Sequence, residues 1–161
     1  MTRDPATELR MAFDRAFAEA PPSAGPPHIE LLRVTLGGAP HVLVLSEIFA
    51  LHADLRITAV PSRRPELLGV ASVRGAIVPV YDLRLAVGVA AVGAPRWTVL
   101  VAGGSAGLAF EGFAGHARIV ASALATATGS SAIRGSVELG GQRHAVVNLE
   151  VVTAMIRKEQ G

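Results

Sequence analysis

Residues 61–84 read PSRRPELLGVASVRGAIVPVYDLR and carry the strongest structural pattern in the chain. Two aliphatic runs, Val70–Arg74 and Ile77–Tyr81, flank the small pair Gly75-Ala76. Short runs rich in Val and Ile on either side of a glycine-containing pair are typical of a β-hairpin. The sequence therefore predicts a hairpin here, preceded by a basic loop and followed by one helical turn over Asp82–Val87.

The same strand–turn–strand pattern recurs on both sides of this hairpin. We expect paired strands over residues 30–36 and 41–45, 97–102 and 108–113, and 135–139 and 143–147. Further strands are predicted over 56–60 and 117–121, with a helical turn over 46–51 and a closing helix over 148–158. Two of the hairpins share a Gly-Gly pair followed three residues later by His41 or His144, and this internal echo suggests two lobes of related design.

The composition favours a compact β-rich domain. The chain has 161 residues, of which 50% are apolar and only 4% aromatic, with 17 Gly and 10 Pro. An aliphatic content this high excludes a disordered chain, and frequent Gly and Pro argue against a helical bundle. The mean hydropathy of +0.43 is high for a soluble monomer. We expect part of the aliphatic excess to fill the core and the rest to form patches that face partners.

Residues with catalytic or ligand-binding chemistry are sparse. The chain has no Cys, its five His show no metal-ligand spacing, and its Arg residues are scattered. Gly103–Gly107 lacks the Lys-Ser/Thr ending of a phosphate-binding loop, so a hairpin turn is the better interpretation. We therefore predict a non-enzyme with no cofactor or metal and no nucleic-acid partner. No apolar run is long enough to span a membrane, and we expect a cytoplasmic protein without membrane insertion.

The N-terminal 27 residues differ from the remainder. Residues 4–20 predict a helix with Leu9, Phe13 and Phe17 on one apolar face, and the proline-rich stretch 21–27 ends it. This helix either packs on the body as an ordinary extension or acts as a detachable partner-binding element. The predicted organisation is thus an N-terminal helix and linker over 1–27, followed by a β domain of two lobes over 28–158.

The central stretch resembles the CheW family, the coupling proteins of bacterial chemotaxis arrays. The resemblance rests on Gly69-Val70, Arg74-Gly75, Ile77–Val80 and Asp82-Leu83, which match the family's Gly-Val-x-Asn-Leu-Arg-Gly and Ile-Val-Pro-Val-x-Asp-Leu pattern. Weaker similarities extend it over most of residues 30–156, at 36–38 with 45–48, 107–111 and 146–150.

The resemblance implies an all-β fold of two small five-stranded SH3-like β-barrels side by side, with an N-terminal and a C-terminal helix. It also implies a non-catalytic adaptor that links the cytoplasmic tips of methyl-accepting chemotaxis receptors to the regulatory domain of a CheA-type histidine kinase. The receptor tip is expected in an apolar groove between the lobes, and the kinase on lobe surfaces.

The resemblance also points to the residues expected to bind proteins. These are Leu45, Glu47, Gly69, Val70, Arg74, Gly75 and Phe113. The family's counterpart of Arg74 pairs with the Glu at position 47, which could equally be a pair that only stabilises a lobe. Leu45 could instead be an ordinary core residue, and Gly69 marks a point where the backbone bends or a partner comes close.

The chain departs from the family pattern in two places. Ser72-Val73 stands where the family has Asn-Leu, and the stretch after Ile119 is short and lacks the customary charged, proline-rich insertion. Kinase binding is therefore doubtful, and an alternative is an accessory CheW-like protein that binds receptors but couples poorly or not at all to the kinase. An alternative from another class is a small-ligand-binding or catalytic β-barrel that uses the cleft between the lobes.

Overall fold

The computed structural model describes residue 6 and residues 25–126 and 131–158. The helix predicted over 4–20 and the first part of the linker, apart from residue 6, lie outside the described residues. Everything below concerns the described part of the chain.

This part of the chain consists mainly of short antiparallel strands. The strands are β1 (His28–Leu36), β2 (Ala39–Val44), β3 (Ala50–Ala53), β4 (Leu67–Val73), β5 (Ala76–Asp82), β6 (Trp97–Val101), β7 (Ala106–Phe110), β8 (Gly112–Val120), β9 (Ala125–Thr126), β10 (Ile133–Leu139) and β11 (Gln142–Val147). The α-helices are α2 (Leu83–Ala86) and α3 (Leu149–Lys158), and the 3₁₀ helices are η1 (Leu45–Glu47), η2 (Ala102–Gly104) and η3 (Ala121–Ala123).

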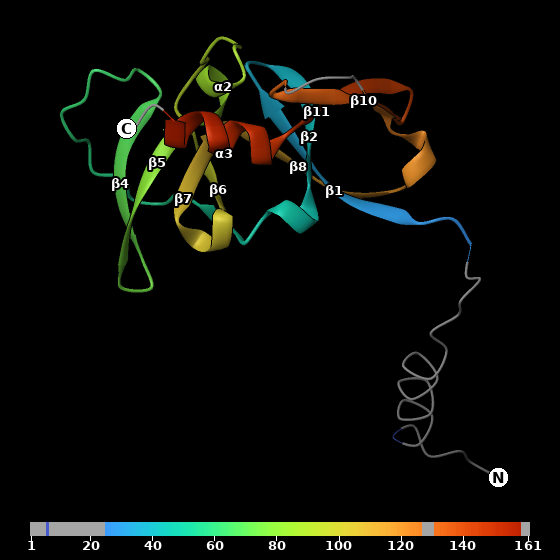
Figure 1. Cartoon of the computed structure of the whole chain (residues 1–161), viewed down its shortest axis with the longest axis horizontal. Coiled ribbons are helices and arrows are strands. Elements are labelled where there is room, and N and C mark those ends of the chain that lie inside the picture. Colours follow the sequence, from blue (N-terminus) through green and yellow to red (C-terminus); the bar gives the residue numbers. More distant parts are fainter. Residues whose placement is uncertain (1–5, 7–24, 127–130, 159–161) are drawn as a thin grey trace.

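The strands form two sheets that lie side by side, with α3 crossing between them (Figure 1). One sheet has the order β3-β6-β7-β5-β4, and the other has the order β8-β1-β2-β11-β10-β9. Each sheet contains two hairpins joined by a central parallel pair, β5 with β7 in one and β2 with β11 in the other. The predicted two lobes of related design are therefore confirmed. The second sheet has a sixth strand because the two-residue β9 is added to its edge.

The internal echo has a different meaning from the one predicted. The two Gly-Gly hairpins, β1–β2 and β10–β11, do not mark separate lobes but are neighbours in the six-stranded sheet. The two ends of the described domain thus combine into one lobe, and the middle of the chain, β3 to β7, forms the other. The echo relates the two halves of a single lobe, because each half contributes one hairpin to the central parallel pair.

Alternate residues of the central strands enter two different cores. In β6, Leu100 packs in the core of its own lobe, whereas Val99 and Val101 enter a large cluster shared by both lobes and by α3. In β1, Leu31 and Leu32 divide in the same way between the core of the six-stranded lobe and the shared cluster. Because successive side chains of a strand point to opposite faces, burial on both faces explains the continuous aliphatic runs of the sequence.

Some predicted boundaries are wrong. Arg74 does not end a strand, because Arg74 and Gly75, with φ of 51° and 82°, form the two-residue turn between β4 and β5. Positive φ at both central positions is the geometry of the type I′ turn that suits the twist of a hairpin. The strand predicted over 56–60 is reduced to a single bridge at Thr58, whereas β3 was missed.

A buried ion-pair cluster fastens α2 to the crossing point between the lobes. Arg84 is 2% exposed and donates two hydrogen bonds to the Asp82 carboxylate, at 2.9 and 2.8 Å. Nη1 of Arg84 also donates hydrogen bonds to the backbone carbonyls of Val92 and Gly93, and it lies 3.6 Å from the carboxylate of Glu111. Glu111 joins β7 to β8 and also accepts from the backbone N–H of Gly37, in the β1–β2 turn. The cluster therefore ties one lobe to the other.

Candidate protein-binding site

The 3₁₀ helix η1 carries two of the predicted site residues at the crossing from one lobe to the other. The chain leaves the six-stranded sheet at Val44 and enters the five-stranded sheet at Ala50. Leu45 is 38% exposed, so it is not a core residue. Glu47 lies two residues further along, and its side chain is half-buried.

Glu47 belongs to a polar network with Arg134 and Asn148. Nη2 of Arg134 donates to the Glu47 carboxylate and, at 3.0 Å, to Oδ1 of Asn148. Asn148 is the N-cap of α3, because its Oδ1 also accepts from the backbone N–H of Val151 at 3.2 Å. The network thus links η1, β10 and the first turn of α3.

The predicted pair between Arg74 and Glu47 is not formed. Arg74 lies in the exposed turn at the free end of the β4–β5 hairpin, where it makes no ion pair with any described residue (Figure 1). Arg134 takes its place, and sequence reasoning missed this residue because an isolated Arg within a strand carries no pattern of its own.

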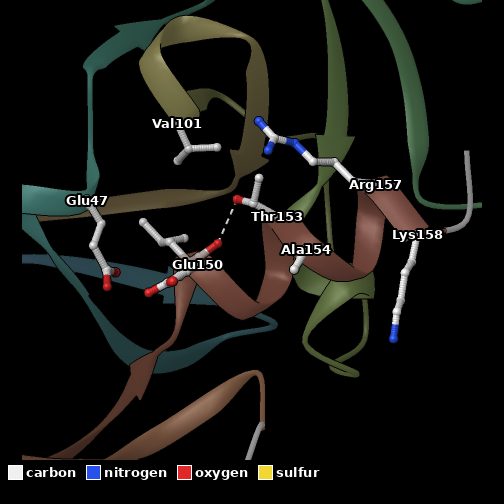
Figure 2. Close-up of a pocket in the computed structure, with 8 residues that line it drawn as sticks. Glu47, Val101, Glu150, Thr153, Ala154, Arg157 and Lys158 are labelled. Atoms are coloured by element: carbon white, nitrogen blue, oxygen red, sulfur yellow. Dashed lines mark hydrogen bonds between the residues drawn. The ribbon is translucent and has the colours of Figure 1, made fainter.

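A groove runs along α3 at the junction of the lobes, with a volume of about 720 Å³. We call it the α3 groove, and it is lined by Glu47, Val101, Leu149, Glu150, Thr153, Ala154, Arg157 and Lys158. Figure 2 shows the acidic side chains Glu47 and Glu150 near the start of α3 and the basic Arg157 and Lys158 near its end. The groove therefore combines an apolar wall with ends of opposite charge.

A second groove, of about 510 Å³, opens at the start of β1. We call it the β1 groove, and it is lined by His28, Ile29, Glu30, Val44, Leu45, Ser46, Leu124 and Arg134. Leu45 lines the β1 groove and Glu47 lines the α3 groove, so η1 contributes to both. The Glu47–Arg134 ion pair joins one residue from each lining.

Gly69 provides a close approach between two segments of the same chain. It has φ of 151°, and a Cβ there would lie 2.1 Å from the carbonyl oxygen of Thr58. The backbones of Thr58 and Val70 exchange two hydrogen bonds, at 2.8 and 2.9 Å. Gly135 has the equivalent place in β10, where a Cβ would lie 1.8 Å from the Ala125 carbonyl oxygen of β9. The partner that comes close to Gly69 is therefore the chain itself.

Phe113 lies on β8, where its ring packs against Trp97 of the other lobe with centroids 5.1 Å apart and planes tilted by 58°. It remains 37% exposed. The predicted site residues thus occupy separate places: η1, the edge strand β4, the β4–β5 turn and β8. The structure groups Leu45 with Glu47 on η1 and the four residues Gly69, Val70, Arg74 and Gly75 on the β4–β5 hairpin, and Phe113 belongs to neither group.

Comparison with protein families identifies the architecture. The model of the CheW-like domain matches residues 30–157, which include both lobes, η1 and most of α3. The chain belongs to the CheW-like domain family. Among solved structures, it is similar to the scaffolding protein TtCheW from Thermoanaerobacter tengcongensis, with a TM-score of 0.69 and 19% identity over 80% of this chain and 92% of that one. No curated protein matches the sequence.

Other chemical features of this CheW-like chain have structural explanations. Gly103–Gly107 fits the Gly-x-Ser-x-Gly pattern of hydrolase nucleophiles, but it lies in the connection between antiparallel β6 and β7 rather than at a strand-to-helix turn. Hydrogen bonding to Asp82 raises the pKa of Arg84, the nearby charges of Asp82 and Glu111 act in the same direction, and burial opposes them.

The described residues include no group of three or more His, Cys, Asp or Glu suited to hold a metal ion. They also contain no helix with the length and apolar character required to cross a membrane.

Proposed function

We propose that this CheW-like protein is a non-catalytic adaptor of a bacterial chemosensory array. It links the cytoplasmic tips of chemoreceptors to the regulatory domain of a CheA-type histidine kinase, and it acts in the cytoplasm. The observation that carries the proposal is the family match over residues 30–157, which spans both lobes and the elements that form the grooves between them. The likeness to the scaffolding protein TtCheW supports it through the fold.

The receptor tip binds at the α3 groove and the adjoining η1 in this proposal. Ala154 is exposed on the groove wall, whereas Val101 and Leu149 are buried beneath it. Leu45 stands exposed beside the groove, so Ala154 and Leu45 offer apolar contacts to a helical partner. The acidic and basic ends of the groove favour a partner helix with the opposite order of charges, which would fix its direction.

The kinase binds the five-stranded lobe in this proposal, at the β4–β5 hairpin that carries Gly69, Val70, Arg74 and Gly75. The hairpin turn is exposed, and Ile77 beside it is 68% exposed, so an apolar and a basic side chain are available to a partner. The short stretch after Ile119 belongs to the other lobe, and the lack of the family's customary insertion there would weaken a second docking surface.

Separate pull-down assays with a receptor cytoplasmic fragment and with the kinase regulatory domain test the proposal. If the protein is an adaptor, it should bind both the receptor fragment and the kinase regulatory domain in these assays. Retention of the receptor alone would favour the accessory version, and retention of neither would refute the proposal.

A matched pair of variants tests the role of η1. Leu45→Ser should weaken receptor binding roughly tenfold, because an apolar contact residue at an interface contributes about 1–2 kcal/mol. Val92→Ser removes a more exposed aliphatic side chain from the loop after α2 and should leave binding unchanged. Equal affinities of the two variants would exclude η1 from the receptor interface.

A further inference from the structure

The described domain begins at the rim of the β1 groove. The carbonyl of Pro27 accepts from the backbone N–H of Ala121 at 2.8 Å, which anchors the chain beside η3. The next two residues, His28 and Ile29, line the groove, and Leu124, which directly follows η3, lines it as well. Whatever precedes Gly25 in the sequence is therefore tethered directly beside this groove.

The backbone also bends where the chain enters. Gly25 has φ of 62°, a conformation that L side chains rarely adopt, and the bend is followed by the stiff pair Pro26-Pro27. A left-handed residue at this point redirects the chain immediately outside the groove. Pro26 and Pro27 reduce the number of directions in which the preceding segment can leave.

The sequence of the preceding segment matches what the groove offers. The groove contains the half-buried Ile29 and Leu124 and the exposed Leu45, with Glu30 and Arg134 as charged neighbours. The segment carries Leu9, Phe13 and Phe17 at successive intervals of four residues, which places them on one face of a helix. The charged residues at the groove already have partners, Glu30 with His116 and Arg118 and Arg134 with Glu47, so the match is between apolar side chains.

We propose that residues 4–20 dock as a helix in the β1 groove of their own chain, with Leu9, Phe13 and Phe17 against Leu45, Ile29 and Leu124. A short tether supports the intramolecular form, since it holds the segment at an effective concentration of the order of millimolar. The docked segment covers Leu45 and so competes with a partner at η1. This competition, unlike the docking itself, rests on the proposed adaptor function.

Paramagnetic relaxation in the full chain tests the docking. The chain has no Cys, so a spin label attached to Ser46→Cys, an exposed residue that lines the groove, is the only label present. We expect a loss of intensity for the backbone amide signals of residues 8–20, relative to the same sample after reduction of the label. A label at Ser72→Cys, an exposed residue of β4 in the other lobe, should leave those signals unchanged.

Two further variants separate docking from general proximity. Phe13→Ser should restore the signals that the Ser46→Cys label attenuates, whereas Asp14→Ser, on the polar face, should preserve the attenuation. Unattenuated signals with the Ser46→Cys label, or equal attenuation by both labels, would overturn the proposal. Attenuation in a mixture of spin-labelled, unenriched protein with unlabelled, ¹⁵N-enriched protein would assign the docked segment to a neighbouring copy and also overturn it. Neither receptor nor kinase is present, so these results are independent of the pull-down assays.

Discussion

Gly69 and Gly135 occupy equivalent points in the two lobes. Each lies at a register shift in its strand, and each leaves room for the carbonyl of a short segment that pairs along the sheet edge. The segment is the Thr58 bridge in one lobe and β9 in the other. The glycines are therefore explained by contacts within the chain, whatever partners also bind nearby.

Gly69→Ala should destabilise the protein by about 1–3 kcal/mol, because φ of 151° is strained for an L side chain and the new Cβ would collide with the Thr58 carbonyl. Urea unfolding monitored by circular dichroism measures the change. Ser72→Ala, an exposed position on the same strand, is the control and should change stability by less than about 0.5 kcal/mol. An unchanged midpoint for Gly69→Ala would mean that the Thr58 segment can move away without cost.

Arg84→Met should cost about 3–5 kcal/mol, because it leaves the buried Asp82 carboxylate without its partner. The pKa of Arg84 is raised in the folded state, so its contribution is fully present below the ordinary arginine pKa and is lost only as the pH rises through the higher folded value. The contribution of Arg84 to the free energy of unfolding should therefore stay constant as the pH rises from neutral to mildly alkaline. Urea titrations of the parent and of Arg84→Met at several pH values would check this.

Arg96→Met is the matched control for Arg84→Met. Arg96 also pairs with an Asp, Asp54, but both side chains are more than half exposed, at 63% and 68%. Exposed pairs contribute about 0–1 kcal/mol, so the variant should be nearly as stable as the parent. Similar losses for the two Arg variants would show that burial does not decide the strength of these pairs.

Among the elements, α3 depends on the residue that precedes it. Asn148→Ala should destabilise the protein by about 0.5–2 kcal/mol, because it removes the acceptor for the Val151 N–H and for Arg134. Hydrogen exchange should quicken in the first turn of α3. Asn148→Asp keeps an acceptor and adds a charge suited to a helix N-terminus, so it should retain stability and slow exchange. Rapid exchange in both variants would contradict the capping role.

The elements that the sequence predicted well are those with local patterns. The hairpins β1–β2, β4–β5 and β10–β11 follow from turns with one or two glycines between aliphatic runs, and α3 follows from its helical spacing. The bridge at Thr58 and the pairing of Glu47 with Arg134 were missed. Both join residues far apart in the chain, and no local spacing encodes which partner a lone Thr or Arg will meet.

At the scale of the molecule, the lobes are joined by a core rather than by a linker. The shared cluster contains fully buried residues from both sheets, such as Leu43 and Phe110, together with Leu149 of α3. The chain also crosses between the lobes twice, at η1 and at Glu111. Two lobes with a common core cannot separate without exposing apolar surface, so a groove at their junction is held in shape from both sides.

The shared core predicts that both lobes unfold in one transition. The only Trp of the chain, Trp97, lies in the five-stranded lobe and packs against Phe113 of the other, so its fluorescence reports on that lobe and on its contact with the second, whereas circular dichroism reports on all strands. Leu31→Ala creates a cavity in the separate core of the six-stranded lobe and should cost about 2–5 kcal/mol. We expect it to lower the urea midpoint by the same amount with both probes. A fluorescence midpoint that stays at the parent value while the circular dichroism midpoint falls would mean that the lobes unfold independently, and that the shared cluster does not couple them.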